Sequence, residues 1–327
     1  MVTGLDMADT PVISVVIPLY NKGPYISRAL DSILNQTFQD FEVIVVDDGS
    51  TDEGAEIVRG FDDSRIRLIR QVNRGVSAAR NTGIETARAE LVAFLDADDA
   101  WMPGFLETII SLREHYPDAG LYGTAYEVHF PASIVQRASM REEGERVLSS
   151  YFGALVHAGS PLFNSSSFAA PKNVLLDVGG YPLDVKWNED GALWGKIALR
   201  YPVAYSPDVC SVYNQYSANN SVGITEYLED PFLQYLSTIP GDELLRRGDA
   251  EDLLEYCDLS RLVVISRNIY SGHGARARSE LSSVKSPRYT WTRYKLQVLS
   301  YIPRCGMRLI RKHAKTLSYI KRKIIRT

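Results

Sequence analysis

The chain has 327 residues, of which 45% are hydrophobic, and a formal net charge of −4. This composition suits a globular protein with one large core and an appendage, and it excludes a disordered chain. The three cysteines are far apart and form no C-x-x-C pair, which argues against a disulfide framework and a zinc knuckle. No apolar run reaches the roughly 18 to 20 residues of a membrane span, and the first residues lack the features of a signal peptide, so we expect a cytoplasmic protein.

Up to about residue 116 the chain alternates between two patterns. Short apolar runs rich in Val and Ile are typical of strands buried on both faces of a parallel sheet. Such runs occur at 12–20, 41–49, 65–71 and 90–97. Segments with apolar residues at helical spacing follow them at 24–34, 50–61, 76–87 and 102–116. Ser50 and Glu53 have capping-box spacing, and Pro103 suits the first turn of the last helix. The alternation predicts an α/β fold with a mostly parallel central sheet flanked by helices.

From about residue 119 the pattern is less regular. The expected elements are a strand at 121–130, a flap to about 150, helices at 172–181 and 189–201, an edge strand at 203–216, and helices beyond about 223. The chain contains no internal repeat and no low-complexity tract. A second, helical region is therefore expected after the sheet domain.

Acidic side chains stand at the ends of two of the buried runs. Asp47 and Asp48 are at the end of the second run, and Asp96 and Asp98 are at the end of the fourth. Because the carboxyl ends of parallel strands meet at one edge of a sheet, these carboxylates should share a cleft and need a cation. Hard oxygen ligands suit Mg²⁺ or Mn²⁺, and such an ion would bind the phosphates of a substrate. Neither G-x-x-x-x-G-K-[ST] nor G-x-G-x-x-G follows the first run, so we do not expect a glycine-rich phosphate loop.

Six motifs follow one another between residues 12 and 216. They are SVVIPLYN, VIVVDDGSTD, NRGVSAARNTGI, AFLDADD, GGY and NEDGALWGKIA. As a set they resemble the family 2 glycosyltransferases, which are inverting enzymes of the GT-A fold that use nucleotide-diphospho-sugars. The resemblance implies a GT-A domain, which we place at 11–222. Before it we expect a disordered or extended N-terminus at 1–10, and after it a helical region with a basic amphipathic tail at 223–327. It also implies a metal-dependent hexosyltransferase with a UDP-sugar as the favoured donor.

The resemblance assigns several residues to the nucleotide. Pro18 and Tyr20 match positions that border the nucleobase, and Asp48 matches a carboxylate that hydrogen-bonds uracil or ribose. Arg80 and Asn81 lie in the segment that lines the nucleotide pocket. Each assignment has a structural alternative: Asp48 could belong to an ordinary turn, Tyr20 could be a core residue, and Arg80 could pair with a surface carboxylate.

The resemblance also assigns the D-x-D pair and the catalytic base. Asp96 matches the carboxylate nearer the ribose, Asp98 matches the one on the metal, and Asp190 matches the base of the family's E-D motif. A general base that takes the proton of the acceptor hydroxyl contributes roughly 100- to 10,000-fold. The start of a helix lowers the pKa of Asp190, whereas desolvation by Trp187 and Trp194 would raise it. The alternatives are a solvated loop at DADD and an ordinary first helical turn at Asp190.

The acceptor side and the metal shell complete the expected site. The residues expected on the acceptor side are Gly179, Gly180, Glu189 and Trp187. Many relatives carry a Y-R-x-H run after the last strand, in which the His joins the metal or the diphosphate. Here Asn214 and Tyr216 take the Arg and His places. Either the Tyr216 hydroxyl contacts the phosphate, or water completes the metal shell.

Two other function classes match parts of the sequence. A phosphorelay receiver also has an acidic pair after a strand, but it places that pair after its first strand and needs a Lys-Pro dipeptide, which is absent here. A relative that binds a nucleotide-sugar without turnover would keep the same motifs. Asp190→Asn separates this relative from an enzyme, since only the enzyme has transfer to lose.

The end of the chain is strongly basic. No acidic residue follows Glu280, and basic residues alternate with apolar ones through 287–327. This composition suits a helix on an anionic membrane face, with a solvated basic cap or a nucleic-acid patch as alternatives. We hypothesise peripheral attachment at the cytoplasmic face of a membrane, and no nucleic-acid partner is expected. The resemblance suggests a glycan or lipid-linked acceptor in cell-surface polysaccharide assembly.

Overall fold

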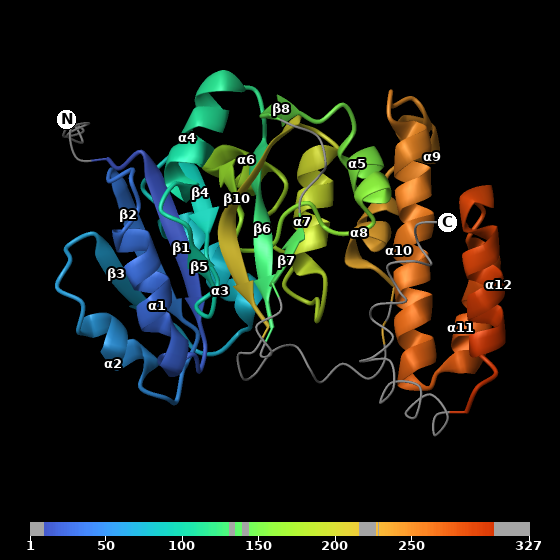
Figure 1. The fold of residues 1–327 in the computed structure, drawn as a ribbon, viewed down its shortest axis with the longest axis horizontal. Coiled ribbons are helices and arrows are strands. Elements are labelled where there is room, and N and C mark those ends of the chain that lie inside the picture. The colour runs from blue at the N-terminus through green and yellow to red at the C-terminus, as the bar shows by residue number, and fades with distance from the viewer. Residues whose placement is uncertain (1–9, 131–134, 139–143, 216–226, 228, 304–327) are drawn as a thin grey trace. The chain divides into compact units, whose positions relative to one another are not determined.

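The protein is described by a computed structural model over residues 10–130, 135–138, 144–215, 227 and 229–303 (Figure 1). The chain forms two compact units, Met1–Tyr151 with Pro161–Asn220 and Phe152–Ser160 with Ser221–Thr327. The domain boundary expected near residue 222 falls outside the described residues and stays a proposal. The segment 152–160 belongs to the second unit, which the sequence did not indicate.

One sheet organises the first unit, with strands in the order β3-β2-β1-β4-β9-β6-β10-β5. These strands are β1 (Ile13–Leu19), β2 (Phe41–Asp47), β3 (Ile66–Arg70), β4 (Leu91–Phe94), β5 (Ala100–Trp101), β6 (Leu121–His129), β9 (Phe168–Pro171) and β10 (Val203–Asn214). Two short strands pair beside them, β7 (Val135–Ala138) with β6 and β8 (Arg146–Val147) with β10. The pairs β1–β2, β1–β4, β2–β3 and β6–β10 are parallel, so the expected mostly parallel α/β sheet is confirmed.

The expectation that 203–216 forms an edge strand is wrong. β10 pairs with β6 on one side and with the antiparallel β5 on the other. The chain just after the DADD motif returns to the sheet as β5, and Met102 N donates to Cys210 O at 2.8 Å. This return covers the edge that β10 would otherwise expose.

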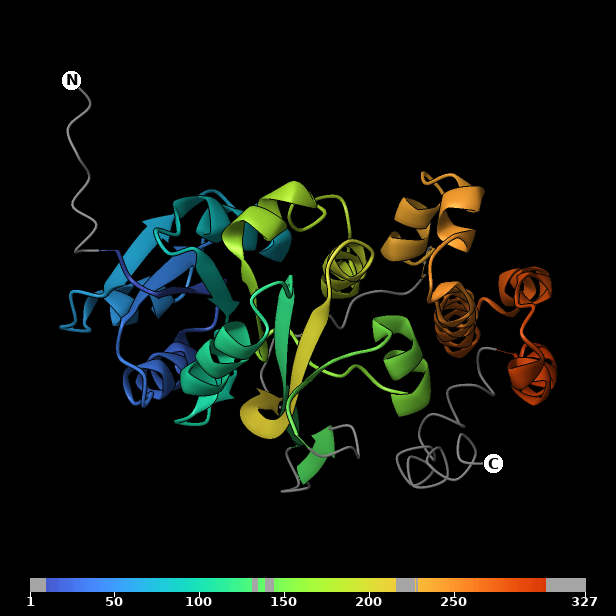
Figure 2. The same ribbon diagram turned by 90° about the horizontal axis from the view of Figure 1, so that it is seen from above.

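Helices cover both faces of the sheet (Figures 1 and 2). They are α1 (Gly23–Leu34), α2 (Gly54–Arg59), α3 (Val76–Thr86), α4 (Phe105–His115), α6 (Lys172–Asp177) and α7 (Glu189–Ala198). α1 and α4 lie on one face, and α3, α6 and α7 lie on the other. Because β1, β2 and β4 are buried along their whole length, their sequences are mainly apolar instead of alternating. The buried polar side chains of Ser14 and Glu42 hydrogen-bond to each other at 2.7 Å.

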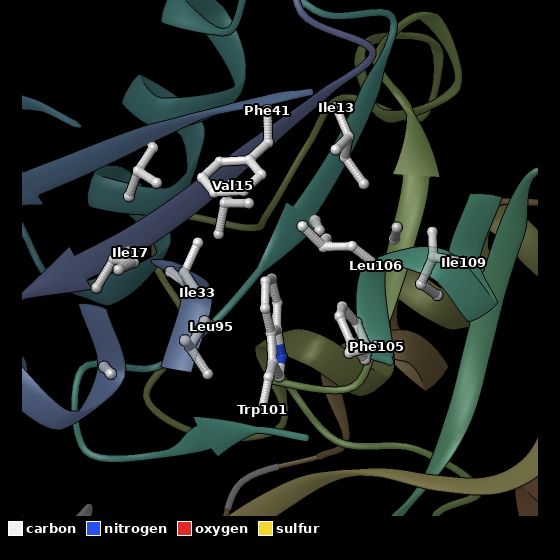
Figure 3. Close-up of a cluster of buried hydrophobic side chains, with 14 of the residues drawn as sticks. Ile13, Val15, Ile17, Ile33, Phe41, Leu95, Trp101, Phe105, Leu106 and Ile109 are labelled. Atoms are coloured by element: carbon white, nitrogen blue, oxygen red, sulfur yellow. The ribbon is translucent and has the colours of Figure 1, made fainter. Parts of the chain in front are cut away.

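The core under α1 and α4 is well packed. Figure 3 shows Ile13, Val15 and Ile17 of β1 in one cluster with side chains of α1 and α4. Trp101 belongs to this cluster and stacks on Phe105, with ring centroids 4.1 Å apart. The interpretation of Trp101 as a packing residue is therefore confirmed.

Two expected helix starts differ from the structure. Ser50 and Glu53 form no capping box: α2 begins at Gly54, and the Ser50 hydroxyl accepts a hydrogen bond from Asn21 N at 3.1 Å. Pro103 precedes the helix, since α4 begins at Phe105. In both cases the residue contacts a segment that is distant in the sequence. Ser50 binds Asn21, and Pro103 O accepts a hydrogen bond from Thr37 N at 2.8 Å.

The second unit is helical. It contains most of α5 (Tyr151–Ala158) together with α8 (Pro231–Leu236), α9 (Gly241–Leu245), α10 (Ala250–Ser271), α11 (Gly274–Glu280) and α12 (Thr290–Leu299), with short 3-10 turns at Leu281–Ser283 and Pro287–Tyr289. Its core joins α10, α11 and α12 through buried residues such as Ile265, Ala277 and Leu296. Among the described helices, none combines the length and the apolar character that crossing a bilayer requires.

The contact between α3 and β1 is unusually close. A Cβ on Gly83 would lie 2.2 Å from Val16 Cγ1, where no real side chain fits. We expect Gly83→Ala to lower the free energy of unfolding by about 1–3 kcal/mol through overpacking. Helix propensity alone predicts the opposite sign, a gain of about 0.5–1 kcal/mol. Denaturant unfolding measures the difference, and a gain in stability would contradict the close packing.

Candidate active site

The carboxyl ends of β1, β2 and β4 meet at one edge of the sheet. Asp48 N donates to Leu19 O at 2.8 Å, and Leu95 N donates to Val16 O at 3.1 Å. Pro18 is buried within β1, whereas Tyr20 is 46% exposed, so the core alternative for Tyr20 is wrong. The segments that carry the expected donor residues are therefore adjacent, as the parallel pairing predicts.

Asp47 has a structural role at this edge. Its Oδ1 accepts the Ser50 N–H at 2.8 Å, and its Oδ2 lies 3.3 Å from Arg70 Nε. The side chain is fully buried. The turn that was the alternative for this acidic pair therefore describes Asp47.

Asp48 organises the loop before α3. Its carboxylate is buried and accepts three hydrogen bonds of 2.8–2.9 Å, from Gln71 Nε2, Arg74 N and Gly75 N. Gly75 has φ of 88°, a conformation that favours glycine. Asp48 thus fixes the loop that leads into α3. A nucleobase that donates a hydrogen bond to Asp48 would use a carboxylate lone pair that these three donors do not occupy.

One buried guanidinium joins carboxylates from two distant motifs. Arg80 is 2% exposed, and it donates through Nη2 to Asp96 Oδ1 at 2.7 Å and through Nη1 to Asp190 Oδ1 at 3.0 Å. Nη1 also lies 3.3 Å from Glu189 Oε1, and the guanidinium carbon lies 5.0 Å from the centre of the Tyr181 ring. Arg80 is therefore no surface ion-pair residue. It gathers the D-x-D motif and the E-D motif into one cluster, which we call the Arg80 cluster.

Burial and charge oppose each other within the Arg80 cluster. Burial opposes the charge of Arg80, but the attraction of Asp190, Asp96 and Glu189 outweighs it and raises the pKa of Arg80 well above its usual value. Burial raises the pKa of Asp190 to about 7, although the charge of Arg80 lowers it. The charges of Glu189 and Asp96 add to the rise. Asp190 is still 18% exposed, so it can exchange a proton with a ligand near neutral pH.

The buried side chain of Asp99 fixes the loop after β4 through hydrogen bonds. This buried carboxylate accepts the Ser166 hydroxyl at 2.6 Å and the Asn214 N–H at 2.9 Å. Ser166 Oγ accepts the Asp96 N–H at 3.0 Å, and Asn214 Nδ2 donates to Asp98 O at 2.8 Å. Burial and the charges of Asp96 and Asp98 raise the pKa of Asp99 well above its usual range. The solvated-loop alternative for DADD is therefore wrong.

The departure from the Y-R-x-H pattern has a structural consequence. Asn214, at the place of the Arg, is buried at the end of β10 and binds the backbone of the D-x-D loop. Tyr216, at the place of the His, lies outside the described residues, so its contact with a phosphate stays a prediction. Asn214 thus positions Asp98 by binding its backbone carbonyl oxygen.

The D-x-D carboxylates form ion pairs with basic side chains of the chain itself. Lys22 Nζ lies 2.7 Å from Asp98 Oδ2, and Arg80 binds Asp96. Within the part of the chain that the structure describes, no three His, Cys, Asp or Glu side chains are grouped to hold a metal ion. The available donors are the carboxylates of Asp96 and Asp98, whose side chains are 23% and 14% exposed. Two hard oxygen donors at a site that already accommodates a positive charge fit Mg²⁺ or Mn²⁺ with further ligands from water and phosphate.

The GGY turn is built as expected, and Asn81 holds it. Gly179 and Gly180 have φ of 78° and 64°. Asn81 Oδ1 accepts the Tyr181 N–H, and Asn81 Nδ2 donates to Tyr181 O, both at 2.9 Å. A Cβ on Gly180 would lie 2.6 Å from Asn81 Oδ1, so only glycine allows this approach. Trp187 is half-buried in the segment between this turn and α7.

Sequence reasoning gave no role to Lys22, Asp99 or Ser166. Asp99 was visible as the last acid of DADD, but nothing in the motif shows which way its side chain points. Lys22 and Ser166 are 76 and 67 residues from their carboxylate partners. No local spacing could reveal such pairs.

Comparison with known proteins shows which family the chain resembles. The model of Glycosyl transferase family 2 matches residues 14–163. Over this segment the chain is similar to the family 2 glycosyltransferases. An uncharacterized glycosyltransferase of Nostoc sp. is 30% identical over 220 residues, which are 64% of this chain and 66% of that protein. The uncharacterized glycosyltransferase EpsJ of Bacillus subtilis is 46% identical over 91 residues, which are 27% of this chain and 26% of EpsJ. The chain thus spans less than two thirds of the length of either relative.

Two solved structures share the fold of this chain. S. aureus TarS 1–349 in complex with UDP-GlcNAc superposes with a TM-score of 0.67 at 18% identity, over 93% of this chain and 91% of that fragment. The mannosyltransferase PcManGT from Pyrobaculum calidifontis, in complex with GDP-Man and Mn²⁺, has a TM-score of 0.55 at 22% identity, over 89% of this chain and 86% of that protein. The expected GT-A fold is therefore confirmed.

Removal of the guanidinium that the three carboxylates share should destabilise the protein. We expect Arg80→Met to cost roughly 3–5 kcal/mol of unfolding free energy at pH 8, because it leaves the carboxylates that it joins without their partner. The cost should shrink towards pH 5, where Asp190, whose pKa is already raised to about 7, takes up a proton. Denaturant unfolding at both pH values measures this dependence.

A surface pair supplies the control for Arg80→Met. Arg113 lies 3.0 Å from Glu90, and the two side chains are 31% and 87% exposed. Arg113→Met should cost less than about 1 kcal/mol at either pH. Equal costs for the two variants would contradict the structural importance of the Arg80 cluster.

Proposed function

We propose that this chain is an inverting glycosyltransferase of the hexosyltransferase class, which moves a sugar from a nucleotide-diphospho-sugar to an acceptor hydroxyl. The Arg80 cluster carries this proposal, because it holds the base candidate Asp190 and the D-x-D residue Asp96 on one guanidinium. A proton acceptor and a diphosphate-binding edge are the two parts that such a transfer needs. The titles of the TarS and PcManGT structures, which name UDP-GlcNAc and GDP-Man, support a nucleotide-sugar donor.

The nucleotide would bind at the carboxyl ends of β1 and β2. The exposed ring of Tyr20 can stack on a nucleobase, next to Pro18 at the end of β1. Asp48 presents the loop 71–75 by holding its backbone N–H groups. Asn81 contributes by fixing the GGY turn, and UDP remains the favoured nucleotide.

The diphosphate would lie against the D-x-D loop. Asp98, with Asp96, would hold Mn²⁺ or Mg²⁺, and such an ion supplies charge neutralisation to a departing diphosphate. Asn214 and Asp99 keep this loop in place through the hydrogen bonds described above. Lys22 provides a second positive charge beside the same carboxylate.

Asp190 would act as the general base. A pKa of about 7 makes its carboxylate a stronger base than an ordinary Asp while leaving much of it ionised at neutral pH. The carboxylate takes the proton of the acceptor hydroxyl as the new bond to the anomeric carbon forms and the bond to the diphosphate breaks. Arg80 orients Asp190 and limits the rise of its pKa.

The acceptor and the location of the enzyme extend the proposal. Gly179, Gly180, Glu189 and Trp187 would border an acceptor, which we propose to be a glycan or a lipid-linked sugar. A cytoplasmic enzyme held at the membrane by 287–327 would meet such an acceptor. Of this segment, 304–327 lies outside the described residues.

The pH dependence of transfer tests the role of Asp190. We expect kcat/KM to fall about tenfold per pH unit below about pH 7, because protonated Asp190 cannot accept a proton. Asp190→Asn should lose roughly 100- to 10,000-fold in rate and lose this pH limb, while it keeps nucleotide binding. Initial rates with a UDP-sugar and a nucleotide-binding titration measure the two properties.

Glu189→Gln is the matched control for Asp190→Asn. The charge of Glu189 raises the pKa of Asp190, so this variant should keep the pH limb and move it to lower pH. A limb that survives Asp190→Asn would exclude Asp190 as the base. Nucleotide binding without any transfer by the wild-type chain would indicate a binding relative without turnover.

The donor and the metal can be tested together by thermal shift. In a panel of UDP-, GDP- and dTDP-sugars, we expect UDP-sugars with Mn²⁺ to raise Tm most, because ligands that bind the native state stabilise it. Asp98→Asn should remove the Mn²⁺-dependent part of the shift, whereas exposed Asp118→Asn should keep it. A UDP-sugar shift that is identical without Mn²⁺ would contradict the role of Asp98.

A further inference from the structure

A row of exposed aromatic side chains marks the outer surface of α12. Trp291, Tyr294, Val298 and Tyr301 are 62%, 60%, 52% and 67% exposed. Their spacing of three, four and three residues places them on one side of α12 and of the turn that follows it. Four of the seven exposed large apolar or aromatic side chains within residues 229–303 lie in this row. The exposure is therefore concentrated in one place.

The opposite side of α12 is packed. Leu296 is buried in the core of the second unit, and Leu299 and Ile302 pack against it. Tyr289, just before the helix, belongs to the same core. α12 is thus an anchored amphipathic helix whose second apolar row points away from its own core, which is the arrangement expected of an interaction surface.

Basic side chains accompany the aromatic row. Lys295 Nζ lies 5.1 Å from the centre of the Trp291 ring, and the Arg278 guanidinium lies 4.4 Å from that of Tyr301. Lys285 and Arg293 are close to the row in the sequence, and no acidic residue follows Glu280. Acidic side chains of the preceding helices are engaged, Glu280 with Arg276, Glu255 with Arg288 and Asp258 with Arg261. Any partner of this surface should therefore be anionic.

We propose that the α12 face, defined as Trp291, Tyr294, Val298 and Tyr301 with Lys295 beside it and with Lys285 and Arg293 close to it in the sequence, docks on an anionic lipid bilayer. Trp and Tyr rings are enriched at the interface between lipid headgroups and acyl chains, where one end of the ring is apolar and the other is wet. Lysine and arginine beside them are attracted to anionic lipids. A short helix with these two features lies in the plane of the interface.

The ring geometry favours a bilayer over a nucleic acid. Trp291 and Tyr294 stack on each other, with ring centroids 5.5 Å apart and planes 13° apart. Their facing surfaces are therefore occupied, whereas single-strand binding needs ring faces open to bases. Stacked rings beside the aliphatic Val298 form one apolar ridge that can enter the headgroup layer.

This inference rests on the proposed peripheral membrane attachment and assigns it to a folded surface instead of to the tail beyond residue 303. It does not involve the Arg80 cluster or the donor site. Membrane binding can therefore fail while the transferase proposal stands, and the reverse also holds.

Tryptophan fluorescence of the full chain tests the α12 face directly. Of the four tryptophans, Trp101 and Trp194 are buried, Trp187 is half-buried and Trp291 is exposed. With vesicles of phosphatidylcholine and phosphatidylglycerol, we expect a blue shift and quenching by brominated acyl chains. Trp291→Phe should abolish both signals, and Trp187→Phe should keep both. Quenching that survives Trp291→Phe would overturn the proposal.

Vesicle co-sedimentation measures the contribution of each part. Trp291→Ser with Tyr294→Ser should weaken binding at least about tenfold. Replacement of Lys285, Arg293 and Lys295 by Gln should weaken it on the order of a hundredfold on anionic vesicles. The matched control is Leu245→Ser with Leu254→Ser, at positions that are 63% and 55% exposed on other helices, and it should bind as the wild type does.

Three results would overturn the proposal. Wild-type binding by both α12 variants would assign attachment to the chain beyond residue 303, or show that this segment covers the face. Equal binding to pure phosphatidylcholine would exclude the charge component. Displacement of the α12 face from vesicles by single-stranded RNA at equal charge would favour a nucleic acid. The UDP-sugar thermal shift, measured on the α12 variants, should be unchanged and reports separately on the donor site.

Discussion

The buried guanidinium of Arg80 is the interaction on which the rest of the site depends. Three carboxylates from the loop after β4 and from the start of α7 approach one another, and without a shared cation they would separate or take up protons. A buried guanidinium without these carboxylates would itself be strongly unfavourable. The guanidinium and the carboxylates therefore require each other. Their ion pairs, together with packing, fix the position of α7 relative to the loop after β4.

The sequence predicted the parts of the fold that are set by local pattern. Mainly apolar runs indicated β1, β2 and β4, because strands buried on both faces carry few polar residues. The capping box at Ser50 failed, since the hydroxyl found a better partner in Asn21, on a different strand end. The edge-strand interpretation of β10 failed for a related reason, because its alternation says nothing about the short β5 that returns to cover it.

The candidate site shows the same division. Asp48, Asp96, Asp98 and Asp190 could be named from motifs, and the structure brings the last of these to Asp96 through Arg80. The sequence indicated two opposite effects on the pKa of Asp190, a decrease from the helix start and an increase from desolvation. In the structure burial is the stronger effect and raises this pKa. Lys22, Ser166 and Asn214 meet the D-x-D loop across 76, 67 and 116 residues of sequence, so their roles come from the fold alone.

The placement of α5 has a consequence for how the protein can be divided. Residues 152–160 leave the first unit and return to it, and within the second unit Phe152 stacks on Phe232 with ring centroids 5.6 Å apart. A Cβ on Gly153 would lie 2.5 Å from Asp252 Oδ2, so α5 and α10 are in intimate contact. A fragment ending near residue 222 would strip α5 of these neighbours and leave its apolar side in water. The two units are thus interleaved along the chain, and no single cut yields two intact halves.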